Sequence, residues 1–359
     1  MSKIKLMLLI LLLTTAGGVE AQILCKEFVY EPKDFPSCHA STIACLQNGD
    51  LVTSFFGGSY EGCPDVCIWV CRKTAGSDRW TEPAMAADGV INDTLRKECY
   101  NPVLYQMPDG ELWLFIKIGS CVADWSGWLT RSHDNGVTWS PREPLPDGFL
   151  GPIKNKPELI GNRLVCPSST ENDGWKIHFE IYDLNTREWH KTPDIEAALA
   201  PSLQESETIT PIAAIQPSII RLADGTLQVL CRTQNGKLAT SYSHDNGETW
   251  TRLALTDVPN NCSGVDAVTV HPTLHALVYN PVESIVGDYR DPRTPIDVAT
   301  SMDGIYWNKL VTLDHEPGSE FSYPAVVVDP TDGTLHITYT WKRQRIVYAH
   351  IKPSYINQN

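Results

Sequence analysis

Six polar residues could line a common site, because each stands where an apolar, strand-like segment begins. They are His39, Asn101, Lys156, Gln216, Asp266 and Tyr323. Their imidazole, amide, amine, carboxyl and phenol groups can hydrogen-bond a polar ligand, and several can transfer protons. Segments that only pack a core would carry apolar or small residues at these points. The six positions therefore predict a ligand-binding site.

Repeated elements must bring these six residues together. An apolar segment, a polar turn and a second apolar segment recur six times along the chain. The pairs span residues 41–46 and 51–56, 103–106 and 112–116, 158–160 and 164–166, 218–222 and 227–231, 267–270 and 274–279, and 325–328 and 335–340. A third segment follows each pair.

Most repeats end in an Asp-containing turn followed by a Trp. The clearest two copies, Ser132–Trp139 and Ser243–Trp250, agree at seven of eight positions. The closing Trp residues stand at positions 80, 139, 189, 250 and 307, which gives steps of 50 to 61 residues. Four short strands in a unit of this length predict a propeller blade.

We therefore predict an all-β fold in which residues 22–359 form a single six-bladed β-propeller. A strand at Ile23–Tyr30 and the C-terminal run Ile346–Ile351 are expected to complete the last blade together. Only Asp194–Ala200 has a helical pattern.

The predicted topology places the chemistry on one face. In a four-stranded antiparallel blade, the start of strand one, the end of strand two and the start of strand three share an edge. The six polar residues lie at that edge, as do Arg232 at the end of a second strand and Arg293 before a third. Asp65, on the loop after a second strand, joins them, whereas the Asp-containing turns fall on the opposite face.

Composition limits the partners and the compartment. A net charge of −14 argues against a nucleic-acid partner. Residues 1–21 have a basic start, an apolar run and small residues before position 22, which predicts a cleaved signal peptide and a secreted or periplasmic protein. No other segment is apolar enough for a membrane span. Cys63, Cys67 and Cys71 are interpreted as small buried residues, so neither a metal nor a cofactor is expected.

The repeats, together with four short phrases, resemble the sialidase (neuraminidase) superfamily, and within it the bacterial "predicted neuraminidase" group with BNR or Asp-box repeats. The phrases are residues 38–42, 151–157, 215–218 and 320–325, and the resemblance extends over the mature chain. It implies that Tyr323 is the nucleophile and Asp65 the acid/base. It also implies that Arg232 and Arg293 hold a substrate carboxylate, which planar guanidinium groups can bind bidentately.

Two positions depart from the superfamily pattern. His39 stands where a third carboxylate-binding arginine is usual, and Gln216 stands where a Glu activates the Tyr. A Gln side chain cannot accept the phenolic proton. His39 is the candidate for that base, because an unperturbed imidazole titrates near neutral pH.

The leading hypothesis is an exo-acting, sialidase-like glycoside hydrolase that releases a terminal acidic sugar from a glycan. Tyr323, Asp65 and His39 would be catalytic; the expected substrate-binding residues are Arg232, Arg293, Gln216, Lys156, Asn101 and Asp266. A uronate-directed polysaccharide lyase is one alternative, with His39 as base and Tyr323 as acid. A rhamnosidase-like enzyme and a non-catalytic glycan-binding propeller are the others.

Overall fold

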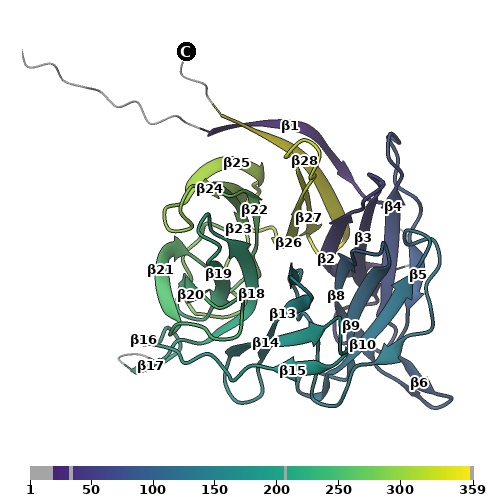
Figure 1. Ribbon diagram of the computed structural model, residues 1–359, viewed down its shortest axis with the longest axis horizontal. Coiled ribbons are helices and arrows are strands. Elements are labelled where there is room, and N and C mark those ends of the chain that lie inside the picture. The colour runs from purple at the N-terminus through teal and green to yellow at the C-terminus, as the bar shows by residue number, and fades with distance from the viewer. Residues whose placement is uncertain (1–18, 32–34, 206–207, 356–359) are drawn as a thin grey trace, which may run out of the picture.

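Six four-stranded antiparallel sheets surround a central axis, which confirms the predicted six-bladed β-propeller (Figure 1). The computed structural model describes residues 19–31, 35–205 and 208–355. The predicted signal peptide lies outside the described residues except for its last three positions. Within the described residues, no helix has the length and apolar character needed to cross a bilayer.

The first three blades follow the chain in order. Blade one contains β2 (Ser37–Cys45), β3 (Leu51–Gly58), β4 (Cys67–Lys73) and β5 (Ala84–Ala87). Blade two contains β8 (Glu98–Gln106), β9 (Leu112–Gly119), β10 (Ser126–Ser132) and β11 (Glu143–Pro144). Blade three contains β12 (Glu158–Ile160), β13 (Arg163–Thr170), β14 (Lys176–Asp183) and β15 (Trp189–Lys191).

Two further blades have the same plan. Blade four contains β18 (Ala214–Arg221), β19 (Leu227–Thr233), β20 (Lys237–Ser243) and β21 (Ala254–Pro259). Blade five contains β22 (Asp266–His271), β23 (Leu274–Tyr279), β24 (Ile296–Ser301) and β25 (Asn308–Asp314). Small hairpins lie between blades: β6 (Val90–Asn92) with β7 (Leu95–Arg96), and β16 (Leu199–Pro201) with β17 (Ile209–Pro211).

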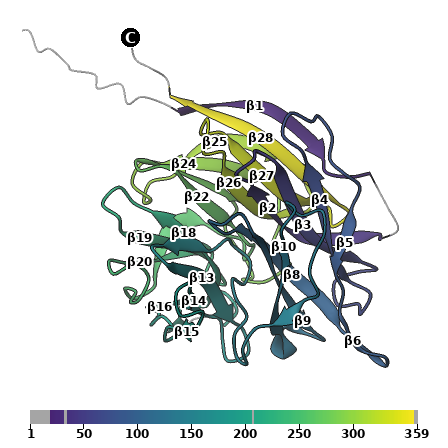
Figure 2. The same ribbon diagram turned by 45° about the vertical axis from the view of Figure 1, so that its right-hand side comes forward.

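Blade six closes the ring with both ends of the chain. It contains β26 (Phe321–Val328), β27 (Leu335–Trp341), β28 (Arg345–Tyr355) and, outermost, β1 (Val19–Phe28). β1 pairs antiparallel with β28, from Phe28 opposite Val347 to Ile23 opposite Ile351. The two strands run side by side in both views (Figures 1 and 2). The predicted closure by the N- and C-terminal strands is therefore confirmed.

The predicted helix at Asp194–Ala200 is wrong. The segment is extended, because its backbone bonds to neighbouring chain segments instead of to itself: Ile195 N–H donates to Ile177, and Ala198 N–H donates to Leu253. Ile195, Ala197 and Ala198 pack against the core between blades three and four. The one helical element in the described residues is a 3₁₀ turn, η1 (Val122–Asp124).

The Asp-containing turns lie at the edge away from the predicted site. Ser132, at the end of β10, pairs with Leu112, which in turn pairs with Gln106 at the end of β8. The Asp134 carboxylate accepts hydrogen bonds from Val137, Thr138 and Ser132. Although partial burial opposes it, these bonds lower the pKa of Asp134 to about 2. The turns are structural, as expected.

Bulges interrupt the innermost strands of four blades at matching points. The register shifts between His39 and Thr42, Tyr100 and Val103, Ile215 and Ser218, and Ser322 and Ala325. Each bulge contains a residue with positive φ: Ala40 (54°), Asn101 (36°), Gln216 (56°) and Tyr323 (52°). Such backbone costs about 1–3 kcal/mol per residue and re-aims the side chain. These bulges therefore set the directions of three of the predicted site residues.

Candidate functional site

Tyr323 is the central residue of the site. Its hydroxyl oxygen receives hydrogen bonds from Arg232 Nη1 at 2.7 Å and from Gln216 Nε2 at 3.2 Å. Tyr323 is partly exposed, whereas Arg232 and Gln216 are buried. The structure thus brings together one predicted catalytic residue and two predicted binding residues, and it points two N–H donors at the phenol oxygen.

Two arginines converge on the Tyr323 ring, as the topology predicts. The guanidinium carbon of Arg232 lies 5.7 Å from the ring centroid, and that of Arg293 lies 6.0 Å away. Trp175 covers Arg232 at 4.9 Å. Among the described residues, Nε of each arginine is buried and has no hydrogen-bond partner. Each of these two Nε–H groups is therefore a buried donor without an acceptor in the described part of the chain, which is uncommon.

A third arginine completes the group, and sequence reasoning did not assign it to the site. Arg343 Nε donates to Glu320 at 2.8 Å, and Arg293 Nη1 donates to the same carboxylate oxygen at 3.0 Å. Burial acts against ionisation of Glu320, yet Arg343 and Arg293 hold its pKa below the ordinary value. Arg343 stands just past the end of β27, as Arg232 stands near the end of β19, and this shared place was the available signal.

Lys154 is a second cation that the sequence analysis missed. Its buried ammonium donates to the carbonyls of Val265 and Pro324 and to Asn155 Oδ1, and it lies 5.8 Å from the centroid of the Tyr323 ring. Burial lowers the pKa of Lys154 to about 7. Cationic side chains thus gather around Tyr323 although the whole chain carries a net charge of −14.

His39 is a neighbour of Tyr323 across the junction of blades one and six, as predicted. The two ring centroids are 4.1 Å apart with planes inclined at 49°, and His39 Nδ1 lies 3.0 Å from Thr340 Oγ1. Burial, together with Arg343, Arg293, Arg232 and Lys154, holds the pKa of His39 well below its usual range. The ring is therefore neutral. Among the described residues, the hydroxyl of Tyr323 bonds to Arg232 and Gln216 and not to His39.

Three predicted binding residues bond to groups other than the Tyr323 hydroxyl. Lys156 Nζ forms an ion pair with Asp266 at 2.9 Å, and the Asp266 carboxylate also accepts bonds from Ser218 and from Val326 N–H. These bonds connect blades three to six, so both side chains hold the inner strands together. Asn101 is buried in its bulge, and its carbonyl accepts a bond from Lys117 Nζ at 3.2 Å.

Asp65 lies on the exposed loop between β3 and β4. Its carboxylate accepts hydrogen bonds from Ser59 N–H at 3.0 Å and Ser59 Oγ at 2.7 Å. An ion pair between Glu61 and Arg343 ties the same loop to the arginine group. The loop that carries the predicted acid is therefore anchored to the arginine group, and Asp65 itself is exposed to solvent.

Behind this loop, Glu98 is a buried carboxyl group that sequence reasoning also missed. It is 2% exposed, and neither of its oxygens has a hydrogen-bond partner in the described part of the chain. Burial raises the pKa of Glu98 to about 7, against a smaller opposing effect of the nearby Tyr100 hydroxyl and Gly62 N–H. A polar residue at the start of β8, three positions before Asn101, was the only signal in the sequence.

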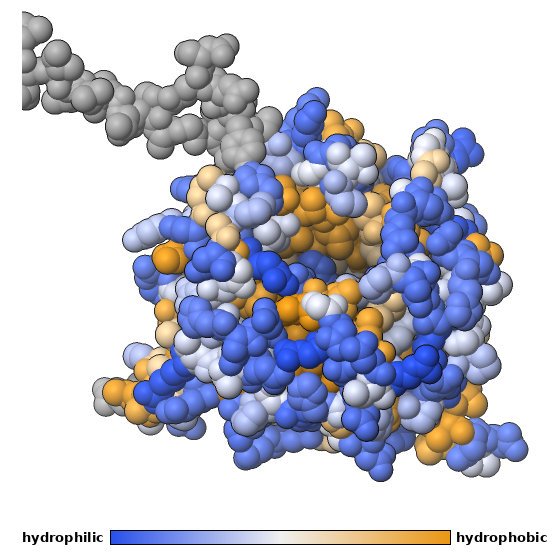
Figure 3. Space-filling view, in the orientation of Figure 1, coloured by the Kyte–Doolittle hydropathy of each residue, from blue (hydrophilic) through white to orange (hydrophobic). Residues whose placement is uncertain are grey.

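The innermost strands of the blades surround the centre of the ring. Innermost strands of neighbouring blades contact one another, β2 with β8 and β26, and β22 with β18 and β26. Figure 3 shows that the molecule is hollowed at this centre, with hydrophobic residues on the wall of the hollow and mostly hydrophilic residues around it. A ligand site between the blades is consistent with this shape.

Comparisons with known proteins agree with the fold. Solved structures that match include a protein of unknown function from Dyadobacter fermentans (TM-score 0.71, 14% identity, 93% of this chain and 99% of that one). The NanB sialidase of Streptococcus pneumoniae also matches, with a TM-score of 0.66 and 13% identity. The match covers 92% of this chain and 70% of the sialidase chain. The intramolecular trans-sialidase of Ruminococcus gnavus matches with a TM-score of 0.64 and 13% identity. The match covers 87% of this chain and 94% of the trans-sialidase chain.

A search of curated proteins finds no match. The family model described as a BNR repeat-like domain matches residues 49–337, which is most of the chain and includes blades two to five entire and three strands of blade one. The chain therefore belongs to the BNR repeat-like domain family, and its fold is similar to that of the matching sialidases.

Proposed function

We propose that the protein is an exo-acting glycoside hydrolase that releases a terminal acidic sugar from glycans. The observation that carries the proposal is the bonding of the Tyr323 hydroxyl to Arg232 and Gln216 inside a group of three arginines. Guanidinium groups that converge on one point suit a sugar carboxylate, and a partly exposed phenol beside them suits attack on the adjacent anomeric carbon.

Activation of Tyr323 would rest on its donors. The position that holds a Glu in the resembled superfamily is Gln216, which cannot take the phenolic proton. Two N–H groups directed at the phenol oxygen would stabilise the negative charge that this oxygen carries when it attacks. Arg232, Arg293 and Arg343 add positive charge around the ring. The site would thus replace a base with electrostatic stabilisation.

Asp65 would provide the proton transfers. Tyr323 first gives its phenolic proton to solvent. In the first step, the Tyr323 oxygen then forms a bond to the anomeric carbon while Asp65, in its protonated form, protonates the departing glycosidic oxygen. In the second step, Asp65 takes a proton from water, whose oxygen then displaces Tyr323 from the same carbon. Export from the cell, as residues 1–21 predict, would place this activity where glycans are found.

A lyase is the second candidate, and the neutral His39 favours it. An unprotonated imidazole 4.1 Å from the Tyr323 ring could remove a proton α to a uronate carboxylate, with Tyr323 protonating the leaving oxygen. The product would contain a carbon–carbon double bond conjugated with the carboxylate, and it would absorb in the near ultraviolet.

Incubation with sialylated and uronate-containing glycans tests both candidates. Mass spectrometry of a hydrolase reaction shows a free saturated acidic sugar, with no rise in near-ultraviolet absorbance. Tyr323→Phe should abolish release, whereas the control Tyr289→Phe, at an exposed tyrosine, should not. Binding of a glycan without any release by the native protein would contradict both enzymes and support a glycan-binding propeller.

A further inference from the structure

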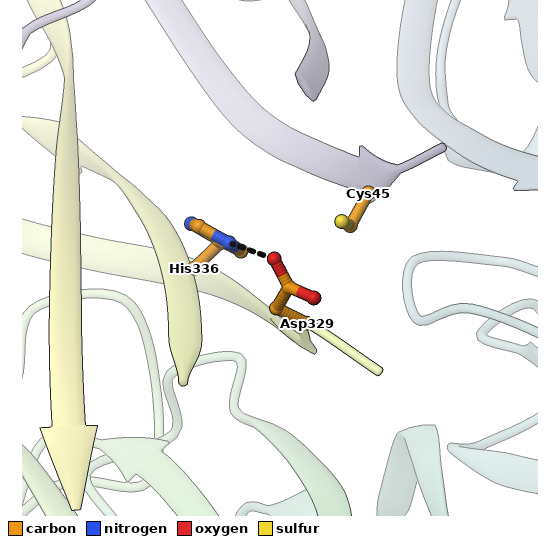
Figure 4. Close-up of side chains that lie close together, drawn as sticks. All are labelled: Cys45, Asp329 and His336. Carbon is orange, nitrogen blue, oxygen red and sulfur yellow. Dashed lines mark ion pairs between the residues drawn. The ribbon is translucent and has the colours of Figure 1, made fainter. Parts of the chain in front are cut away.

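A second cluster of reactive side chains lies on the face opposite the Tyr323 site. Cys45 is the last residue of β2, Asp329 follows the end of β26, and His336 is the second residue of β27 (Figure 4). Cys45 pairs with Leu51 at the turn end of blade one, whereas His39 lies toward the other end of the same strand. The cluster is therefore independent of the proposed catalytic group.

The three side chains point toward one another from two blades. Their ligand atoms, a thiol sulfur, a carboxylate oxygen and an imidazole nitrogen, all lie within 4.8 Å of one another. His336 Nε2 and Asp329 Oδ2 are 3.7 Å apart, which is too long for a good hydrogen bond. Two ligands of a tetrahedral zinc ion lie about 3.4 Å apart when each bond is about 2.1 Å long.

The imidazole of His336 gives a second, independent indication of a ligand. His336 is 5% exposed, and its Nε2 has no hydrogen-bond partner in the described part of the chain. Figure 4 shows this nitrogen directed at Asp329, with Cys45 beyond it. A buried imidazole nitrogen without a partner is unusual, because buried polar atoms are nearly always bonded.

The other nitrogen of His336 is fixed in the way that metal-binding histidines are fixed. His336 Nδ1 lies 2.8 Å from Tyr348 Oη, and the ring of His350 stacks on His336 with centroids 4.5 Å apart. A hydrogen bond at one ring nitrogen holds the imidazole in the orientation in which the other nitrogen can bind a metal. Cys45 and Asp329 are only half buried, so an ion could reach the cluster from solvent.

We propose that Cys45, Asp329 and His336 bind one Zn²⁺ ion, with water as the fourth ligand. Thiolate and imidazole ligands select zinc over Ca²⁺ and Mg²⁺, which prefer oxygen. Binding replaces the S–H bond of Cys45 with a sulfur–zinc bond, and the proton goes to solvent. Cys45 belongs to blade one and the other two ligands belong to blade six, so the ion joins the two blades beside the ring closure. Its role is to stabilise the closed propeller.

The full-length protein, stripped with a chelator and dialysed, is titrated with Zn²⁺ by calorimetry and examined by native mass spectrometry. We expect one ion per chain and a rise of roughly 5 °C in Tm at saturating zinc, as expected for a ligand that binds only the folded state. Cys45→Ser and His336→Gln should lose the ion and the shift. The controls Cys121→Ser and His133→Gln, at exposed positions, should keep both.

Cobalt provides a direct readout of the ligands in the native protein, which matters if a variant does not fold. Co²⁺ at a tetrahedral site with a thiolate ligand should give strong visible bands and a near-ultraviolet sulfur-to-cobalt band. The proposal is overturned if the native chain binds no stoichiometric zinc. It is also overturned if the cobalt spectrum lacks the sulfur band, or if the two cluster variants bind zinc as the native protein does.

Discussion

The Arg232 guanidinium donates a 2.7 Å hydrogen bond to the hydroxyl of Tyr323 and lies 5.7 Å from the centroid of its ring. Arg293, at a similar distance from the ring, bonds to Glu320 instead. One arginine thus contacts the proposed nucleophile directly, whereas the other faces the same space from beside it. Under the proposed function, Arg232 therefore helps to activate Tyr323, whereas Arg293 serves chiefly to bind the sugar carboxylate.

Alanine variants of the two arginines should therefore differ. Arg293→Ala should chiefly raise KM, because each charge-assisted hydrogen bond to the substrate contributes about 1.5–3 kcal/mol. Arg232→Ala should raise KM and also lower kcat, because the Tyr323 oxygen loses a donor. Steady-state kinetics on the acidic substrate measures both, with the 90% exposed Arg79→Ala as control. Equal effects on kcat in both variants would contradict the division of roles.

Asp65→Asn should lower kcat by about 10²–10⁴-fold on natural glycans, the usual contribution of a general acid–base group. A leaving group that departs readily needs no protonation in the first step. With such a substrate, the Asp65→Asn variant should therefore lose less of its rate in that step. Burst kinetics with an activated aryl glycoside measures this, and Asp78→Asn, whose side chain is 95% exposed, is the control. An equal loss of the burst rate on both kinds of substrate would remove Asp65 as the acid.

His39→Gln should keep turnover within about tenfold of the native value. If His39 were the general base, the same change would lower turnover by about 10²–10⁴-fold. The reason is structural: the Tyr323 hydroxyl bonds to Arg232 and Gln216. Separate measurement of kcat and KM, with His133→Gln as an exposed control, decides it. A hundredfold loss of kcat at unchanged KM would make His39 the base that the sequence predicts.

Glu98→Gln should stabilise the protein at alkaline pH but not at acid pH. The folded-state pKa of Glu98 is about 7, above the ordinary value of 4.5, so its ionisation opposes folding. The penalty is absent below about pH 4.5, grows as the pH rises and is complete above about pH 7, where it reaches about 3 kcal/mol. Urea unfolding at pH 4.5 and 8 measures it, with the exposed Glu31→Gln as control. If Glu98→Gln raised the free energy of unfolding equally at both pH values, the charge of Glu98 would not be the cause of the stabilisation.

The sequence allows the fold to be predicted because every blade repeats a pair of apolar segments and all blades but the sixth carry a closing Trp. Alternating apolar segments, tight turns and a closing Trp recur in register, and Trp250 stacks on Phe179 at 4.0 Å as such a ring should. The helix prediction for residues 194–200 was wrong because the backbone there bonds to Ile177 and Leu253 instead of to itself. Only the assembled blades provide these partners.

The site was partly predictable for a related reason. Strand-end positions locate Tyr323, Arg232 and Arg293, because blade topology puts such ends on one face. The ion pair between Glu61 and Arg343 joins residues 282 positions apart, and no local pattern records it. The bulges likewise could not be predicted from the sequence. In blade one, the residue with positive φ is Ala40, which corresponds to Tyr323 in blade six, so His39 stands one position before that point.

The most direct test of the account is the fate of oxygen when glycans with terminal acidic sugars are incubated with the native protein in H₂¹⁸O. Hydrolysis through Tyr323 forms a new bond between water oxygen and the anomeric carbon. We therefore expect a released, saturated acidic sugar that carries one ¹⁸O, and no release by Tyr323→Phe. An unsaturated product without ¹⁸O, or full activity in Tyr323→Phe, would contradict it.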